Sequence, residues 1–93
     1  MAIKTFNCEQ TRALFLGERV RRWVIVERPA LRKLEQLDWS SVLDDLRIAP
    51  GNRLEALKGR RKGQHSIRIN DQWRVCFVWT EQCPKSVELV DYH

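Results

Sequence analysis

Hydrophobic and polar residues follow two different periods along this chain, one before Pro50 and one after it. From Pro29 the apolar residues recur at helical spacing, at Ala30, Leu31, Leu34 and Leu37. This spacing, with charged residues on the outer side, predicts an amphipathic helix. Proline suits its first residue, because the missing N–H would lack a helical partner there in any case. We therefore expect a helix that starts at Pro29 and continues through Leu37, and a break in the chain at residues 50–52.

Shorter elements surround this helix. Ile3–Phe6 is a short run that fits an edge strand, and Glu9–Leu16 has a weak helical pattern that a glycine ends. Trp23–Val26 is apolar and fits either a strand or a loop. Residues 41–44, Ser-Val-Leu-Asp, resemble a capping box and predict another turn of helix.

Beyond Pro50 the period becomes two, as in a strand with one buried face. The predicted buried face carries Ile67, Ile69, Trp73, Val75, Phe77 and Trp79. Asn70-Asp71 between the strands is a tight-turn pair, because both residues tolerate left-handed backbone angles. Val87–Val90 is the closing strand. This order predicts a single α+β domain over residues 1–93: a curved antiparallel sheet with the N-terminal helices packed on one face.

The composition indicates in which compartment the protein works and what kind of partner it binds. Lys and Arg number 17 and Asp and Glu 12, for a net charge of +5, which favours an anionic partner. No apolar run approaches the roughly 18 residues of a membrane span, and the start lacks a secretory pattern, so we expect a cytoplasmic protein that does not bind membranes. Cys8, Cys76 and Cys83 match no zinc spacing, and Cys76 fits a buried reduced thiol. We expect no metal and no cofactor.

Positive charge is concentrated where the hairpin is predicted. Residues 53–79 hold seven cations and only Glu55 and Asp71 as acids. A half-buried sheet gains nothing from such like charge, so a polyanion outside the protein would explain it. The cations expected to contact an RNA backbone are Arg53, Arg60, Arg61, Lys62 and Arg68. A charge run is more often only a solvated loop, but the net charge of the chain favours binding here.

Two further cations and the terminal tripeptide suit the cleavage of RNA without metal. In that reaction a base deprotonates the 2′-OH, a cation stabilises the phosphoryl charge and an acid protonates the leaving oxygen. Lys58 before a glycine fits a phosphate contact, although a plain solvated lysine is the more common case. Arg74 in mid-strand fits either a phosphate or a salt bridge with Asp91 or Glu88. Asp91, Tyr92 and His93 supply groups that move protons or stack on a base, although terminal residues often fray.

These residues carry a family resemblance. The segments Asn52–Gly59 and Gly63–Phe77, the terminal Asp91-Tyr92-His93 and the opening Ile3–Phe6 closely resemble the HigB-like toxins of the RelE/ParE superfamily. The resemblance implies a RelE-like fold and a ribosome-dependent endoribonuclease that cuts mRNA in the A site. It further implies a HigA-like helix-turn-helix antitoxin as partner. The toxin would bind operator DNA only as part of the complex with this antitoxin.

Carried over by position, the family's phosphate-contacting and catalytic places fall on Lys58, Arg74, Asp91, Tyr92 and His93. Glu55 stands where some members have a histidine, and Arg60 where an acid is common, so the loop is more basic than usual. One rival is a ParE-like toxin that binds and poisons DNA gyrase without cutting. A second is a plain RNA-binding protein that binds ribosomes without impairing growth.

Overall fold

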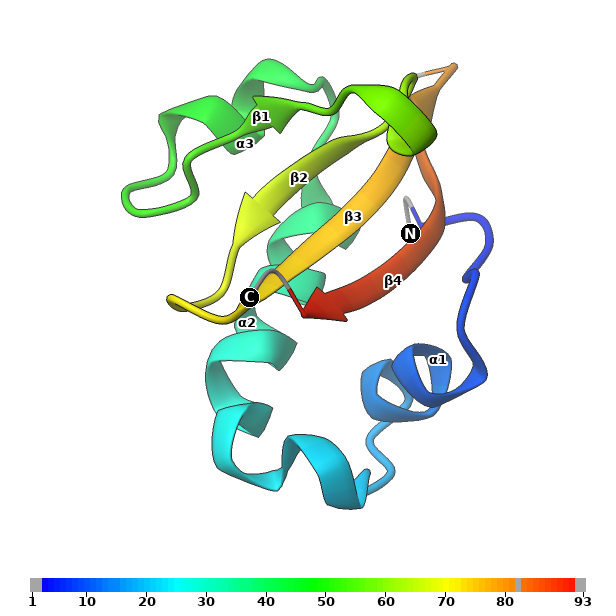
Figure 1. Cartoon of the computed structure of the whole chain (residues 1–93), viewed down its shortest axis with the longest axis vertical. Helices are drawn as coiled ribbons and strands as arrows, with labels where there is room; N and C mark the ends of the chain where they lie inside the picture. Colours follow the sequence, from blue (N-terminus) through cyan, green and yellow to red (C-terminus); the bar gives the residue numbers. More distant parts are fainter. Residues whose placement is uncertain (1–2, 82, 92–93) are drawn as a thin grey trace.

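A computed structural model describes residues 3–81 and 83–91, with helices in the first half of the chain and a sheet in the second (Figure 1). The helical elements are α1 (Glu9–Phe15), η1 (Arg21–Val26), α2 (Glu27–Trp39), α3 (Asp44–Ile48) and η2 (Gly59–Arg61), where η denotes a 3-10 helix. The strands are β1 (Glu55–Ala56), β2 (His65–Arg68), β3 (Trp73–Thr80) and β4 (Cys83–Asp91).

The strands form an antiparallel sheet in the order of the chain, β1-β2-β3-β4. The predicted turn lies between β2 and β3, where Asn70 Oδ1 accepts hydrogen bonds from the backbone N–H groups of Gln72 (2.9 Å) and Trp73 (2.8 Å). A bulge between Cys76 and Val78 shifts the register of β3 against β4. Such bulges increase the local twist of a strand.

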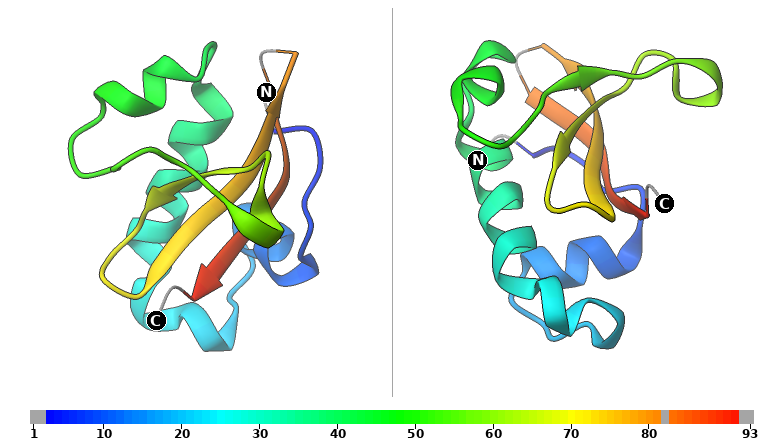
Figure 2. Two further views of the ribbon diagram at one scale, coloured as in Figure 1. Left: turned by 45° about the horizontal axis from the view of Figure 1, so that its top comes forward. Right: turned by 60° about the vertical axis from the view of Figure 1, so that its left-hand side comes forward.

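The core lies between this sheet and the helices. Helix α2 packs on β3 and β4, and α1 packs on β4, so the helices cover one face of the sheet (Figure 2). Leu34 and Leu37 of α2 meet Val75 and Phe77 in one buried cluster. Trp23 of η1 contacts Trp73 edge-on, with ring centroids 5.9 Å apart. The predicted α+β architecture is confirmed.

The N-terminal segment is less regular than predicted. Instead of a strand, residues 3–6 form a parallel bridge between Phe6 and Val87. The backbone N–H groups of Lys4 and Asn7 donate to the carbonyls of Pro84 and Val87, both at 2.9 Å. The segment therefore covers the outer edge of β4, which would otherwise expose unpaired backbone groups.

Two predicted helix starts were wrong. Helix α2 begins at Glu27 and not at Pro29, because η1 leads directly into it; Pro29 still lies in the first turn, where its missing N–H costs nothing. At α3 the capping carboxylate belongs to Asp45 and not to Asp44: its Oδ2 accepts the N–H groups of Ser41 (2.9 Å) and Val42 (3.2 Å). Within the described part of the chain, no helix is long and apolar enough to cross a membrane.

Candidate functional site

The face of the sheet that the helices leave uncovered carries polar side chains that are nevertheless buried. Cross-strand register places Glu55, Ser66, Cys76 and Glu88 in one row across the sheet, with Arg68 opposite Arg74 beside them. We call these six residues the outer face. Ser66 and Cys76 are fully buried and Arg74 is only 9% exposed. Alternation along the strands predicted the direction of these side chains but not their burial.

Two neutral oxygen atoms accept hydrogen bonds from the Arg74 side chain. Its Nε donates to Ser66 Oγ at 2.8 Å, and its Nη2 donates to the backbone carbonyl of Arg53 at 2.6 Å. Arg53 has a φ of 47°, in the left-handed region that non-glycine residues rarely adopt. Neutral acceptors orient a guanidinium without adding a charge of their own, so these two contacts fix the direction of the Arg74 side chain.

Arg68 lies directly opposite Arg74 on the neighbouring strand. Like charges directly opposite each other destabilise a sheet, so this arginine pair lowers the stability of the fold. Arg68 is bonded to Asp71 in the adjoining turn, where the Asp71 side chain is 98% exposed. The outer face therefore concentrates two guanidinium groups at one end of β2 and β3.

A fully buried asparagine supports the backbone of this site. The Nδ2 of Asn52 donates to the Leu46 carbonyl (3.1 Å) and to Gln36 Oε1 (3.0 Å), and its Oδ1 accepts from Lys33 Nζ. Its own carbonyl accepts the Arg68 N–H at 2.6 Å. Asn52 therefore ties α2, α3 and β2 together one residue before Arg53. The sequence indicated only a chain break here, because the partners come from distant segments.

Lys33, which donates to Asn52, has a lowered pKa. Burial lowers the pKa of the Lys33 ammonium below its ordinary value, and the nearby charges of Arg32 and Arg68 lower it further. Burial disfavours the charged form of a lysine, and like charges do the same.

The basic loop 58–63 divides into anchored and exposed cations. Arg61 Nη2 lies 3.4 Å from Glu88 Oε1, and its Nη1 donates to Gln64 Oε1 at 3.1 Å. Glu88 also accepts from the Asn7 side chain. Arg60 and Lys62 are exposed. Arg61 thus anchors the loop to β4 through Glu88, which sequence reasoning had considered only as a partner for Arg74.

The structure does not gather all the predicted site residues. Lys58 is exposed and lies two residues beyond Ala56, which is in register with His65 and through it with Phe77. Arg74 lies near the start of β3, opposite Arg68. Asp91 is in register with Trp73, which places it on the helical face, and it accepts from Gln72 Nε2 at 3.1 Å. Tyr92 and His93 lie outside the described residues.

The thiol of Cys76 sits among the charges of the outer face. Burial raises its pKa to about 11 from an ordinary 9.0; the charges of Arg61 and Arg74 oppose this shift, and those of Glu88 and Glu55 add to it. Cys76 is therefore a protonated, unreactive thiol at neutral pH. Across residues 3–81 and 83–91, no three His, Cys, Asp or Glu side chains gather in a way that would hold a metal ion.

Comparison with known proteins identifies the family. The family model for the RelE-like toxin of type II toxin–antitoxin system HigB matches residues 22–93. A stretch of 56 residues is 50% identical to Toxin HigB-1 of Vibrio cholerae serotype O1. This stretch covers 60% of the chain and 59% of that relative, which is less than two thirds of the relative's length. The resemblance noted in the sequence is thus confirmed, and the chain belongs to the family of HigB-like, RelE-like toxins of type II toxin–antitoxin systems.

Proposed function

We propose that this chain inhibits translation as a ribosome-dependent endoribonuclease that cuts mRNA in the A site. The observation that supports this most is the geometry of Arg74, whose guanidinium is buried in the sheet and aligned by Ser66 Oγ and the Arg53 carbonyl. An aligned guanidinium matches the oxygens of a phosphoryl group and stabilises the charge that they gain in the transition state. Membership of the toxin family supports the same function.

The proposed reaction uses the RNA's own ribose and no metal. A base removes the proton of the 2′-OH, and the oxygen attacks the adjacent phosphorus. The P–O5′ bond then breaks as an acid protonates the departing 5′-oxygen, leaving a 2′,3′-cyclic phosphate and a 5′-hydroxyl. Arg74 would hold the phosphoryl oxygens, and Tyr92 and His93 would transfer protons and place the substrate. Asp91, which is in register with Trp73 on the helical face, would act only by orienting these two neighbours.

The other cations would bind the RNA on either side of the scissile phosphate. Arg68 stands opposite Arg74, and Lys58 lies toward the other end of the sheet, so the two would contact different phosphates. Arg60 and Lys62 are exposed and would attract the RNA backbone. Arg53 would act mainly through its carbonyl, and Arg61 by anchoring the loop.

The proposed partners follow from the family. A HigA-like helix-turn-helix antitoxin would neutralise the toxin in the cytoplasm, and the chain would reach operator DNA only within that complex.

Primer extension on mRNA from cells that express the chain tests the activity. We expect cuts in phase with the codons, and we expect none in matched cells that express Arg74→Ala at the same level. Intact mRNA accompanied by DNA damage would contradict the proposal and support the gyrase-poisoning alternative. Intact mRNA with ribosome binding and unimpaired growth would support a plain RNA-binding protein.

A further inference from the structure

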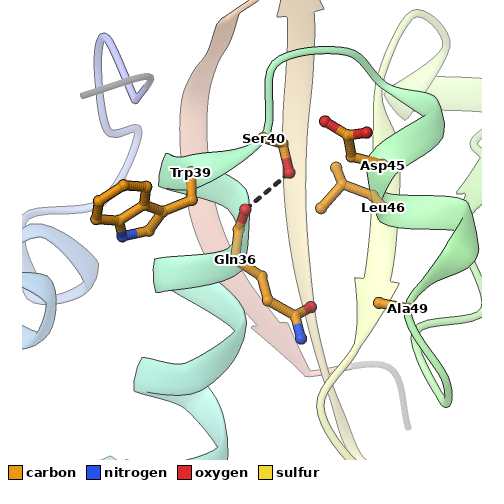
Figure 3. A pocket seen from close by; sticks show the side chains of 6 residues that line it. All are labelled: Gln36, Trp39, Ser40, Asp45, Leu46 and Ala49. Carbon is orange, nitrogen blue, oxygen red and sulfur yellow. Dashed lines mark hydrogen bonds between the residues drawn. The ribbon is translucent and has the colours of Figure 1, made fainter.

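A pocket lies between α2 and α3, away from the outer face. It has a volume of about 320 Å³ and is lined by Gln36, Trp39, Ser40, Asp45, Leu46 and Ala49. Asp45 and Leu46 of α3, with Ala49 directly after it, face Gln36 of α2 and Ser40 directly after that helix. Ser40 Oγ donates to the Gln36 carbonyl at 2.7 Å (Figure 3). The volume is at the lower end of small-molecule sites, which suits one or two side chains of a partner.

Large apolar side chains of the same two helices and their link are exposed to solvent. Trp39 is 83% exposed, and its indole extends outward from the rim on the side away from α3 (Figure 3). Ile48 is 78% exposed and Val42 45%. Exposed tryptophan and aliphatic side chains are typical of protein interfaces, where tryptophan in particular acts as an anchor.

The sign of the charge here is opposite to that of the rest of the molecule. Residues 35–48 contain four acids (Glu35, Asp38, Asp44 and Asp45) and one base (Arg47), for a net charge of −3 within a chain of net charge +5. Glu35 lies one helical turn before Trp39 on α2, and Asp45 lines the pocket itself. This charge repels nucleic acid and attracts a cationic protein segment.

We propose that the acidic pocket face, residues 35–49, is a docking surface for a cationic amphipathic helix of a protein partner. An apolar side chain of that helix would enter the pocket and a second would pack on Trp39. Flanking Lys or Arg side chains would be attracted by the net negative charge of residues 35–48. The identity of the partner as the antitoxin rests on the proposed function. Docking here leaves the outer face uncovered, so neutralisation would not require contact with Arg74.

A synthetic helical peptide of about 16 residues, with leucines on one face and lysines beside them, tests the surface on the complete chain. We expect Ala49→Leu, which fills the pocket, and Trp39→Ala each to weaken binding about tenfold in fluorescence anisotropy. Leu16→Ala at the end of α1, where the side chain is 57% exposed, is the matched control and should change nothing. A peptide with glutamates in place of the lysines should bind at least about tenfold more weakly.

Chemical-shift mapping locates the bound peptide, and shifts should concentrate at residues 35–49. Equal binding to all variants, shifts centred on the outer face, a preference for the acidic peptide, or no binding would each overturn the proposal. Formation of a dimer that Trp39→Ala disrupts would also overturn the proposal, because the face would then bind a second copy of the chain.

Two further measurements separate this inference from the proposed activity. Trp39→Ala and Ala49→Leu should cut mRNA on ribosomes at the wild-type rate and should escape neutralisation by the co-expressed antitoxin. Normal neutralisation of both variants would refute the antitoxin as the occupant. Absence of cutting by the wild-type chain would refute the activity and leave the peptide result standing.

Discussion

At the scale of single residues, the outer face combines a buried guanidinium that is oriented by hydrogen bonds with a buried thiol that keeps its proton. Arg74 is oriented by a serine hydroxyl and a backbone carbonyl, which act as neutral acceptors and fix its planar fork. Cys76, two residues away on the same face, is fully buried, and its pKa is raised to about 11. Of these two buried neighbours, Arg74 is fixed in direction by its hydrogen bonds, whereas Cys76 is kept in its protonated, unreactive form.

The raised pKa of Cys76 predicts slow alkylation. At pH 8 iodoacetamide should label Cys8 and Cys83, which are half-buried, well before Cys76, as peptide mass spectrometry would show. The native Cys76 thiol keeps its proton up to about pH 11, whereas the thiol of the unfolded chain loses its proton near pH 9. The contribution of Cys76 to the free energy of unfolding therefore falls as the pH rises from 9 toward 11. The Cys76→Ala variant should show a smaller fall. Labelling of Cys76 as fast as Cys83 would contradict this assignment.

At the scale of elements, long-range side-chain contacts hold the segments that carry the site. Asn52 joins α2, α3 and β2, and the Arg61–Glu88 pair holds the basic loop to β4. Both sets of contacts lie between segments far apart in the chain. The geometry of the outer face therefore depends on the folded core and not on local sequence preference.

Asn52→Ala should destabilise the protein. The substitution leaves the Leu46 carbonyl and the Lys33 ammonium without their amide partner, and such a loss at a buried site costs roughly 1–3 kcal/mol. Urea unfolding followed by tryptophan fluorescence measures this change. Gln10→Ala, which removes an exposed hydrogen bond to Arg22, is the control and should have little effect. An Asn52→Ala variant as stable as the control would show that the network does not support the fold.

Glu88→Gln should loosen the basic loop. Without the carboxylate, Arg61 loses its ionic partner on β4, and the loop opens more often to protease. Trypsin should then cut after Arg60, Arg61 or Lys62 faster than in the wild-type chain, as timed mass spectrometry would show. Glu9→Gln, which removes an exposed ion pair with Arg12, should leave the rate unchanged. Unchanged cutting of Glu88→Gln would mean that Arg61 does not anchor the loop.

The parts of the fold that could be predicted from the sequence are those with a regular hydrophobic period. The helical spacing in α2 and the alternation in β2 and β3 were sufficient for the α+β architecture, because burial of one face imposes both periods. The roles of Asn52, Ser66 and Glu88 depend on cross-strand register and on helix packing, which no local pattern records. The placement of Asp91 on the helical face follows from register in the same way.

At the scale of the whole molecule, charge is segregated between two surfaces. The basic loop 58–63 holds four cations and no acid, whereas residues 35–48 carry a net charge of −3. Such a separation allows a chain to bind an RNA and a cationic protein at once without competition between them. The toxin would then be recognised on one side while its proposed active side stays accessible.

The salt dependence of RNA binding should follow the exposed loop cations. Replacing both Arg60 and Lys62 by alanine should lower the slope of log K against log salt by about 1.4 for single-stranded RNA, because two counterion-releasing contacts are lost. Fluorescence anisotropy with a labelled oligonucleotide measures it. Arg28→Ala with Arg32→Ala removes the same charge from exposed positions on α2 and should leave the slope nearly unchanged. Equal slopes for the two double variants would indicate that total charge, and not the loop, governs binding.

The most direct test of the account is the rate of mRNA cleavage by Arg74 variants on purified, programmed ribosomes, with folding of each variant verified by circular dichroism. Arg74→Ala should slow cleavage about 10² to 10³-fold, the usual effect of removing one group that stabilises transition-state charge. Arg74→Lys should fall between, because an ammonium keeps the charge and loses the planar fork. Arg28→Ala should cut normally. A folded Arg74→Ala variant that cuts mRNA at the wild-type rate would contradict the central claim.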